Sequence, residues 1–464
     1  MPNARVTNWF GDVVTTPKAV VEAKSTKDIV RILKDTAKYT SPVRAFGSHH
    51  STAACAAADG GTMIGMRGLN RILEITEDSV TVEAGAILID VANALKERGL
   101  QFYVNTEIGN LTMGSAACAG TKDSSMPGEF GQVSSYCTAM KMVLPSGKTL
   151  EANETDNPEL MQMLRCSYGT FGIVTEATFR VRRLQPMEVF HETYSVKDFA
   201  ARLPELWARG CALMYYMYLF DEFITVEFRR YNPRAKGQPD RHVWAIRNNL
   251  WSRIGPLTSF QTERDIDHKP ARYKIIDAFG GIARWNLENL VRSKNTVPTD
   301  QIIRYPEVSD DSRYTFSLWA FPEETYSNVL PKYTKWVKNY YKTKGYRTNM
   351  IHVGYRIAKD QQSLLSYSFD GNVMTIDPVS TANPGWSEFL VDFNQWCSDH
   401  GGVPLPNQTF GFTREQAEKA LGERLGVMAA KRAEFDPENR LLNDFFRTLF
   451  GPIGLRAKRR AAAR

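Results

Sequence analysis

The sequence of 464 residues has little that would place it in a membrane, in an oxidising compartment or around a metal. No run of 18 apolar residues occurs, so we expect no transmembrane helix. The start, MPNARVTNWFG, has no apolar signal region, and we expect a cytoplasmic protein. The six cysteines are irregularly spaced and form no CxxC pair. This excludes a disulfide framework, and no His or Cys has the spacing of metal ligands, so we expect no metal.

Two common nucleotide-binding signatures are also missing. The chain has no GxxxxGK[ST] segment, which makes a nucleoside triphosphatase a poor interpretation. It has no GxGxxG segment after its first expected strand, so a classical dinucleotide fold is not indicated. Any nucleotide site must therefore be built from other turns.

The charge is modest and favours no nucleic-acid partner. The net charge is +7, and part of it lies in the tail RAKRRAAAR, residues 456–464. Such tails are most often simply solvated, so we expect no nucleic acid to bind. The chain is 43% hydrophobic and 23% charged, which is ordinary for a globular protein, and its length predicts two or three domains.

Three stretches differ in texture, and together they predict an α+β fold. Residues 1–185 alternate short Val/Ile-rich strands with glycine turns and a few helices. Residues 186–415 are rich in aromatic residues, with long strands such as 211–231 that predict one large antiparallel sheet. Residues 416–464 are helical, with a break at Pro437.

Three glycine-rich turns in the first stretch could hold an anionic ligand. They are AFGSHHS (45–51), TMGSAACAGTKDSS (112–125) and YGTFGIVTEATFRV (168–181). Small residues let backbone N–H groups approach a ligand closely, and consecutive N–H groups bind anions. The three turns fit a diphosphate in an extended groove, although such turns also simply close strands.

The first of these turns holds two of the chain's seven histidines side by side, His49 and His50. Two buried imidazoles repel each other when charged, so a role in packing alone is awkward. The pair therefore raises the question of whether one of them touches a ligand.

Several segments in the same order resemble one enzyme family. TNWFG (7–11), VRAFGSHHS (43–51), VEAGAILIDVANALKERGL (82–100), SYGTFGIVTEATFRV (167–181) and FDPENRLLNDFF (435–446) are similar to the motifs of the vanillyl-alcohol oxidase type (PCMH type) of FAD-binding flavoproteins. The chain most resembles the aldonolactone oxidase and alditol oxidase branch. The resemblance implies a two-part FAD-binding domain, residues 1–185 with 416–464, around a cap domain, residues 186–415.

The resemblance also implies a covalent bond between FAD and His50, the histidine just before the serine of the first turn. The alternative is FAD held without a covalent bond, with both histidines only donating or accepting hydrogen bonds. By motif position, the other implied FAD contacts are Phe46, Gly47, Ser48, His49, Ser51, Thr106, Thr112, Gly114, Ser115, Gly120, Thr121, Gly172, Ile173, Val174 and Asn443.

On the substrate side, the chain departs from the branch it resembles. The branch has a Glu-x-Arg pair on a central strand, where this chain has Gly354 and Arg356. It also has a His-Trp-x-Lys segment, which is replaced by residues 405–408, ending in Gln408. Residues two apart share a strand face, so we expect His352 and Arg356 to line the substrate side together with Gln408. The alternative for His352 is a hydrogen-bonded histidine in the core of the aromatic domain.

Another turn, FYVNTEIGN (102–110), corresponds to a family turn near the flavin ring. It places Thr106 and Glu107 there, and Glu107 is a candidate catalytic base or substrate anchor. A surface carboxylate is an equally good interpretation of Glu107. Bulk at Thr106 would affect the access of oxygen.

These features predict an FAD-dependent oxidoreductase that oxidises a CH–OH group, with O2 as the acceptor of electrons. Because a carboxylate and a lysine are missing and the cap is rich in aromatic residues, we expect a larger or less polar substrate than a plain polyol or sugar lactone, from specialised-metabolite biosynthesis. The alternatives are oxidation of a C–N or C–C bond with cyclisation, a dehydrogenase with a non-oxygen acceptor, and a binder without activity. The sequence does not indicate an oligomeric state.

Overall fold

The computed structural model describes residues 5–307 and 313–451, and the basic segment 456–464 lies outside them. The first layer is a small parallel sheet with the order β3-β5-β4, formed by β3 (Ala19–Glu22), β5 (Thr62–Gly65) and β4 (Val43–Phe46). Helix α1 (Thr26–Lys34) crosses from β3 to β4. It begins at Ser25, whose side chain accepts a hydrogen bond from the Asp28 amide, and it buries Ile29, Ile32 and Leu33 at helical spacing.

A second, antiparallel sheet lies beside the first and carries most of the remaining N-terminal strands. Its order is β10-β9-β11-β7-β6, and β8 pairs with the far end of β11. The long strand β11 alternates buried Thr175, Ala177, Phe179 and Val181 with more exposed residues. The strands are β6 (Ile72–Ile75), β7 (Ser79–Glu83), β8 (Leu100–Phe102), β9 (Cys137–Val143), β10 (Thr149–Asn153) and β11 (Ile173–Arg183), and the helices between them are α2 (Leu88–Glu97), α3 (Met113–Cys118), the 3-10 helix Val133–Tyr136 and α4 (Pro158–Leu164).

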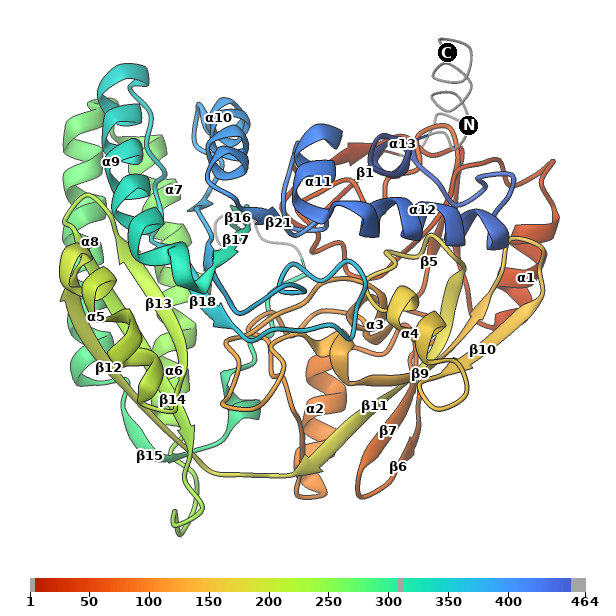
Figure 1. Cartoon of the computed structure of the whole chain (residues 1–464), viewed down its shortest axis with the longest axis horizontal. Helices are drawn as coiled ribbons and strands as arrows, with labels where there is room; N and C mark the ends of the chain where they lie inside the picture. Colours follow the sequence, from red (N-terminus) through yellow and green to blue (C-terminus); the bar gives the residue numbers. More distant parts are fainter. Residues whose placement is uncertain (1–4, 308–312, 452–464) are drawn as a thin grey trace.

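The third sheet is the large antiparallel sheet that the sequence predicts. It has eight strands in the order β15-β12-β14-β13-β18-β19-β17-β21, and it occupies the other half of the molecule (Figure 1). Its strands are β12 (Met187–Ser195), β13 (Ala212–Tyr218), β14 (Phe223–Tyr231), β15 (Ser293–Thr296), β17 (Trp319–Pro322), β18 (His352–Ile357), β19 (Val373–Ile376) and β21 (Val403–Pro404). Two two-stranded pairs complete the strands: β1 (Val6–Thr7) with β2 (Val14–Thr15), and β16 (Thr315–Phe316) with β20 (Val379–Ser380).

Helices cover both faces of the large sheet. On one face, α5 (Val196–Ala208) and α9 (Tyr326–Lys344) pack against each other and against Tyr215, whose hydroxyl donates to Tyr326. On the other face lies a helical insertion that packs near Tyr216 and Tyr218. The insertion comprises α6 (His242–Asn249), the π-helix Leu250–Ile254, α7 (Gly255–Asp265) and α8 (Lys269–Asn289), and short 3-10 helices follow at Pro298–Gln301 and Glu323–Thr325.

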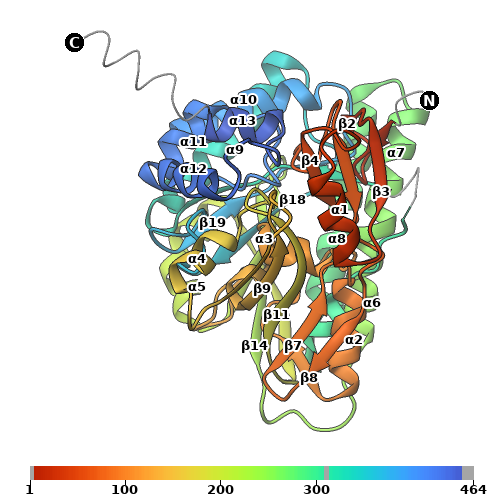
Figure 2. The ribbon, with the colours of Figure 1, turned by 90° about the vertical axis from the view of Figure 1, so that its right-hand side faces the viewer.

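The end of the chain returns to the first sheet. Helix α10 (Trp386–Asp399) precedes the C-terminal helices α11 (Arg414–Leu421), α12 (Glu423–Phe435) and α13 (Asp444–Phe450). The Val43 amide of β4 donates to the carbonyl oxygen of Arg440 at 2.8 Å, and the Arg440 guanidinium donates to Ile32 and Tyr39 carbonyls. Figure 2 shows the first strands and the C-terminal helices at the same end of the molecule.

Most of the expected elements are present, and one helix is shorter than its sequence suggests. Helix α4 ends at Leu164, although the pattern predicts a helix up to Gly169. The backbone turns away because Cys166 and Tyr168 take left-handed conformations, with φ of 56° and 55°. The chain passes from the second sheet to the third between Arg183 and Met187, and the division into domains at 185 and 415 stays a prediction.

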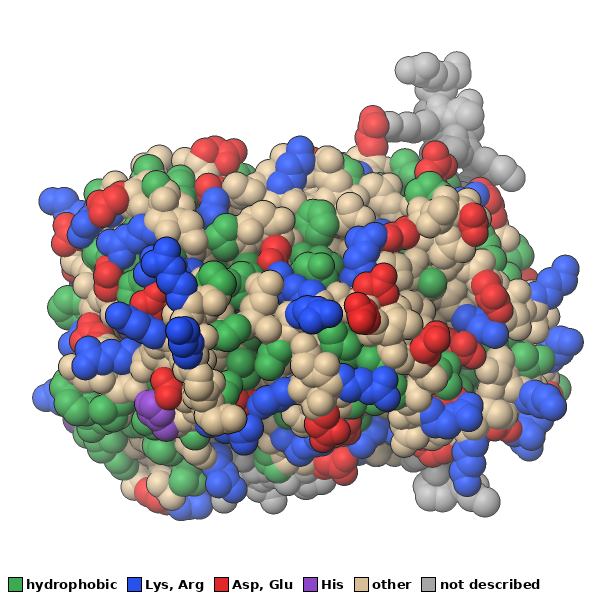
Figure 3. Space-filling model, turned by 90° about the horizontal axis from the view of Figure 1, so that it is seen from below, with side chains coloured by type: hydrophobic (Ala, Val, Ile, Leu, Met, Phe, Trp, Pro, Cys, Tyr) green, Lys and Arg blue, Asp and Glu red, His purple; other side chains and the backbone are tan. Residues whose placement is uncertain are grey.

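The described residues form no membrane-spanning helix, and the face drawn in Figure 3 carries no continuous basic patch. No helix within residues 5–307 and 313–451 has both the length and the apolar character needed to cross a bilayer. On the face drawn in Figure 3, Lys and Arg side chains are interspersed with Asp and Glu. The net charge of +7 is therefore not gathered into one field on that face.

Asn443 joins the C-terminal helices to the first glycine turn, and its loss should destabilise the fold. Its side chain caps α13 by accepting from the Phe446 amide, and it donates to the carbonyls of Ala54 and Ala57 at 2.7 and 2.8 Å. We expect Asn443→Ala to lower the free energy of unfolding by about 3 kcal/mol, the sum of a cap and two hydrogen bonds.

Chemical denaturation measures this loss. Ser195→Ala is the matched control. The Ser195 side chain caps α5, as that of Asn443 caps α13, but it does not donate to backbone carbonyls of another segment as Asn443 does. This substitution should cost about 1 kcal/mol. Equal losses in the two variants would contradict the role of Asn443 as a link between segments.

Candidate functional site

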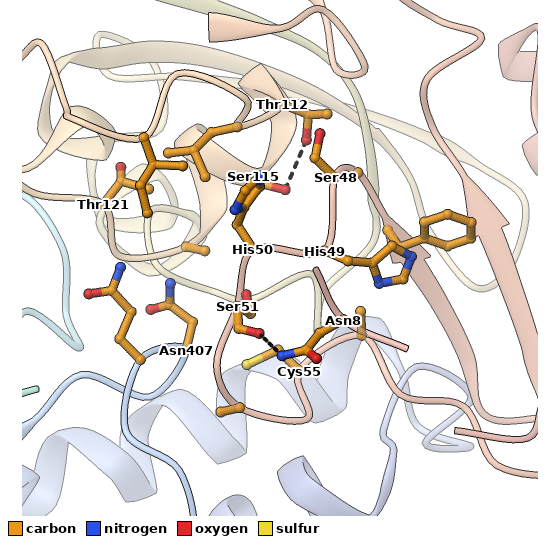
Figure 4. Close-up of a pocket in the computed structure, with 18 of the residues that line it drawn as sticks. Asn8, Ser48, His49, His50, Ser51, Cys55, Thr112, Ser115, Thr121 and Asn407 are labelled. Carbon is orange, nitrogen blue, oxygen red and sulfur yellow. Dashed lines mark hydrogen bonds between the residues drawn. The ribbon is translucent and has the colours of Figure 1, made fainter. Parts of the chain in front are cut away.

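A long cavity runs between the two N-terminal sheets and the large sheet. It encloses about 1750 Å³ of space free of protein atoms, including the part that opens to solvent. All three glycine-rich turns contribute to its wall, and so do strand β18 and the segment around Asn407. Figure 4 shows the middle of this cavity.

The turn that follows β4 is fixed by the segment just after β1. The Trp9 amide donates to the His49 carbonyl at 2.8 Å, and the Asn8 side chain donates to the Ser51 carbonyl at 3.1 Å (Figure 4). The Asn8 carbonyl oxygen in turn accepts from the amides of Gly11 and Val13. The TNWFG motif thus acts as a brace for the histidine turn.

The two histidines project to opposite sides of this turn (Figure 4). His49 has a left-handed backbone, with φ of 56°, and its ring lies 4.3 Å from that of Phe46. The His50 ring stacks on Trp9 at 4.9 Å. Burial lowers the pKa of His49 to about 4 and that of His50 to about 3. Both rings are therefore neutral at pH 7, and their charges do not repel.

Glycines let this turn pack against the start of α3. A Cβ atom on Gly47 would lie 2.2 Å from the Thr112 hydroxyl oxygen, and one on Gly114 would lie 2.7 Å from the Ala84 Cβ. The Thr112 hydroxyl is hydrogen-bonded to Ser115 at 2.9 Å (Figure 4). These glycines therefore serve the close packing of two protein segments.

Arg44, in the strand before the turn, is a buried cation in the cavity wall. Its guanidinium donates to the carbonyls of Cys55 at 2.9 Å, Tyr168 at 2.5 Å, Gly169 at 3.2 Å and Leu441 at 2.8 Å. Burial lowers its pKa to about 10, so it stays charged at neutral pH. A fixed positive charge at this end of the cavity suits an anionic ligand group.

The opposite end of the cavity carries a carboxyl group, that of Glu107. One of its oxygens pairs with Arg247 at 3.1 Å, and the other accepts from the Tyr305 hydroxyl at 2.9 Å. Tyr305 is itself hydrogen-bonded to Tyr314, another residue of the wall. Burial raises the pKa of Glu107 above its ordinary value, while the charge of Arg247 opposes this rise.

A second charged pair lies at the same end. Lys122 Nζ is 2.9 Å from an oxygen of Asp377, and their side chains are only 6% and 1% exposed. The ammonium also lies 4.3 Å from the centre of the Tyr355 ring. Burial raises the pKa of Asp377, and the Lys122 charge opposes that rise. Lys122, Tyr355 and Asp377 all line the cavity.

Strand β18 presents the opposite face from the one predicted. Val353 and Tyr355 line the cavity, whereas His352, Gly354 and Arg356 face helices α5 and α9. His352 is hydrogen-bonded to Tyr333 and Thr348, and Arg356 pairs with Glu323 at 2.8 Å. Gly354 is required because a Cβ there would lie 2.2 Å from the Tyr215 ring. Packing of α5 and α9 thus fixes which face meets the cavity.

Several buried polar atoms of the wall have no hydrogen-bond partner within the described chain. They are Ser48 Oγ, Thr121 Oγ1, Tyr168 Oη, Asp377 Oδ1, Asn407 Oδ1 and Gln408 Oε1. Buried polar atoms are rarely left unpaired, so this set indicates a bound ligand with many polar groups along its length.

The other residues predicted from the sequence can be compared with those that line the cavity. Most of them line it; these are Phe46, Gly47, Ser48, His49, His50, Ser51, Thr106, Glu107, Thr112, Gly114, Ser115, Thr121, Gly172, Ile173, Val174 and Gln408. Gly120 and Asn443 do not line it. Gly120 instead offers its carbonyl to the Asn407 side chain at 2.8 Å, and Asn443 holds the backbone of the neighbouring turn.

Sequence reasoning missed several residues of the wall. Among them are Asn8, Arg44, Lys122, Asp377 and Asn407. An arginine inside an otherwise apolar strand was a usable signal for Arg44. Two charged residues, Lys122 and Asp123, within an otherwise small-residue turn were a usable signal for Lys122.

Comparisons with known proteins agree with this geometry. The model of a family described as FAD binding domain matches residues 17–153. The L-gulono-1,4-lactone dehydrogenase of Mycobacterium tuberculosis is 23% identical over 96% of this chain and 99% of that protein. The L-gulonolactone oxidase of Mus musculus is 26% identical over 40% of each chain.

A crystal structure of cholesterol oxidase from B. sterolicum superposes with a TM-score of 0.69 at 17% identity, over 97% of both chains. The chain thus contains an FAD binding domain within residues 17–153 and has the fold of this oxidase. The cavity, with its unpaired polar atoms, its glycine-rich turns and its buried arginine, fits the dinucleotide FAD. The protein is an FAD-dependent oxidoreductase.

The position of His352 suggests a test of whether its role is structural or catalytic. Burial lowers the pKa of His352 to about 3, against about 6.5 in an unfolded chain. Between these values the unfolded chain binds one more proton than the folded one, so stability falls as the pH falls. At pH 5 this destabilises the flavoprotein by about 2 kcal/mol relative to pH 7.

Between pH 7 and pH 5, we expect the free energy of unfolding of His352→Gln to fall by about 2 kcal/mol less than that of the native protein. Denaturation at both pH values measures this difference. Turnover should fall by less than about tenfold, because the ring does not reach the cavity. The exposed His268→Gln is the control and should leave the pH dependence unchanged. A loss of turnover of a hundredfold or more without a change in pH dependence would restore His352 as a catalytic residue.

Proposed function

We propose that this flavoprotein oxidises a CH–OH group of a small polar molecule, with its FAD joined covalently to His50 and with Glu107 as the base. The observation that carries the proposal is the single cavity that joins the His50 turn to the Glu107 carboxyl. FAD, when bound, supplies the hydride acceptor at N5 of its ring. The remaining tasks fall to the residues of the wall.

The end of the cavity near Arg44 is suited to the dinucleotide part of FAD. Arg44 brings positive charge, and the turns at Gly47–Ser51 and Gly114–Ser115 bring backbone amides. Gly172, Ile173 and Val174 contribute the small and apolar wall that a nucleoside needs. The unpaired Ser48, Thr121 and Tyr168 hydroxyls can donate to phosphate and ribityl oxygens.

Two observations support His50 as the covalent link. Its ring is neutral, because burial lowers its pKa to about 3, so a nitrogen lone pair is free for bonding at neutral pH. The stack on Trp9 fixes the ring plane, and Trp9 also contacts Tyr305 and Tyr314 at the Glu107 end. His49 is turned toward Phe46 and is not proposed as the link.

The covalent bond is tested by precipitating the purified protein with acid. We expect the yellow colour to stay with the pellet of the native protein and to move to the supernatant in His50→Ala, since the bond to the ring nitrogen is lost. His49→Ala is the matched control and should keep its colour in the pellet. Release of FAD from the native protein would remove His50 as the link but keep it as a residue of the cavity wall.

Glu107 is proposed to take the proton of the substrate hydroxyl. A carboxylate with a raised pKa is a stronger base than an exposed one, and the charge of Arg247 opposes the rise in the pKa of Glu107. The Tyr305 and Arg247 contacts hold one orientation of the carboxyl group. The aromatic residues Trp251, Tyr314 and Phe316 also line the cavity.

Sugar lactones are the first substrates to test, because the full-length relative is named as a lactone dehydrogenase. The expectation of a larger, less polar substrate and of a role in specialised metabolism stays a prediction from the sequence. We also propose O2 as the electron acceptor. Rapid reoxidation of the reduced protein in air would support this acceptor, whereas slow reoxidation together with turnover by an artificial dye would indicate a dehydrogenase.

Removing the Glu107 carboxylate should slow the oxidation. We expect Glu107→Gln to lower kcat by about 10²–10⁴-fold, since an amide cannot accept the proton, while the flavin content and spectrum stay unchanged. Anaerobic reduction of the flavin by substrate measures this step directly. Glu323→Gln is the control, because Glu323 pairs with Arg356 outside the cavity. A Glu107→Gln variant that reduces its flavin at the native rate would assign the base elsewhere.

A further inference from the structure

The site lacks two charges at the positions where the resembled branch carries them, yet a charged pair lies at the same end of the cavity. Gly354 and residues 405–408 supply neither the carboxylate nor the lysine. Lys122 and Asp377 form a buried ion pair of 2.9 Å in the cavity wall, from segments that the sequence did not connect. We propose that Lys122 is the cation that stabilises negative charge on the flavin ring and that Asp377 is the counter-ion that offsets its charge.

The inference rests on the proposed function, because it takes the flavin ring to lie at this end. His50 is the reason for that placement. Its ring lies 6.4 Å from that of Tyr305, whose hydroxyl contacts Glu107. Tyr355 then connects the Glu107 carboxyl with the Lys122 ammonium, since it lines the same end of the cavity and its ring lies under that ammonium. A ring attached to His50 therefore extends toward Glu107, Tyr355 and Lys122.

Lys122 is the cation available for this role. Among the described residues that line the cavity, Arg44 and Lys122 are the ones with a permanent positive charge. The Arg44 guanidinium is committed to four backbone carbonyls at the other end. The Lys122 ammonium has three hydrogens, of which one is directed to Asp377. The remaining donors and the charge can act on a ligand.

Asp377 is the buried counter-ion of Lys122. It is 1% exposed, and one of its oxygens pairs with Lys122. Its other oxygen, Oδ1, has no hydrogen-bond partner in the described structure and lies in the cavity wall. The charges of Lys122 and Asp377 offset each other, so the electrostatic field at the flavin ring depends on both residues. Removing the lysine leaves a negative field there, and removing the aspartate leaves a positive one.

Sulfite titration of the FAD-loaded, full-length protein measures this field without any substrate. Sulfite adds its sulfur lone pair to N5 of the oxidised ring, forms an N–S bond and leaves the negative charge on the ring. The visible flavin absorbance is lost in the process. A cation near the ring tightens this binding and an unpaired anion weakens it. The readout is therefore the apparent Kd of sulfite.

Opposite shifts are expected for the two single variants. Lys122→Met leaves the Asp377 charge and should raise the Kd by about tenfold or more, whereas Asp377→Asn leaves the Lys122 charge and should lower it by a similar factor. The double variant restores neutrality and should lie between them. Lys96→Met is the control, because Lys96 pairs with Asp300 outside the cavity, and it should not change the Kd.

The variants also separate this inference from the proposed function. A native protein that holds no FAD overturns the proposed function. A protein that holds FAD but whose Kd for sulfite shifts in the same direction in both single variants, or shifts no more than in Lys96→Met, overturns the role of Lys122. If Lys122→Met fails to retain FAD, the comparison of Asp377→Asn with the double variant still measures the effect of the lysine charge.

Discussion

The site depends on one buried guanidinium. Arg44 donates to carbonyl oxygens of the turn after β4, of the turn before β11 and of the segment before α13, so a single side chain fixes three parts of the chain that are far apart in sequence. Burial of a charge is costly unless hydrogen bonds replace its water, and here backbone carbonyls do so. Any rearrangement of one of these segments would leave the charge without its acceptors. The walls of the cavity are therefore coupled through Arg44.

The other half of the site is set by the large sheet. Helices α5 and α9 require the face of β18 that carries His352, Gly354 and Arg356, because Tyr215 fills the space above Gly354. Tyr355 is left to face the cavity, and it meets Lys122 from the N-terminal half. Lys122 and Asp377 thus come from turns beside different sheets and are brought together by packing that lies outside the cavity itself.

Local patterns in the sequence were sufficient for the fold class and for many of the residues that line the cavity. The Ser25 cap, the alternation along β11 and the glycine turns each act within a few residues, and the histidine turn lies in the cavity wall as its spacing suggests. What could not be predicted depends on contacts between distant segments. The orientation of β18 follows from the Tyr215 ring, 139 positions earlier than Gly354. The pairing of Lys122 with Asp377 requires the sheets to meet, and no local pattern records it.

The return of the chain end to the first sheet has a consequence for biosynthesis. Val43 and Arg44 bond to Arg440 and Leu441, and the Thr52 amide donates to the carbonyl of Asn407. During translation the first 400 residues therefore leave the ribosome without the last wall of the cavity. Contacts of such long sequence separation form late and slow the folding of a chain. A protein cut short before Arg440 would keep all three sheets and the residues that line the cavity, but it would lose the Arg440 and Leu441 carbonyls that hold Val43 and Arg44 in place.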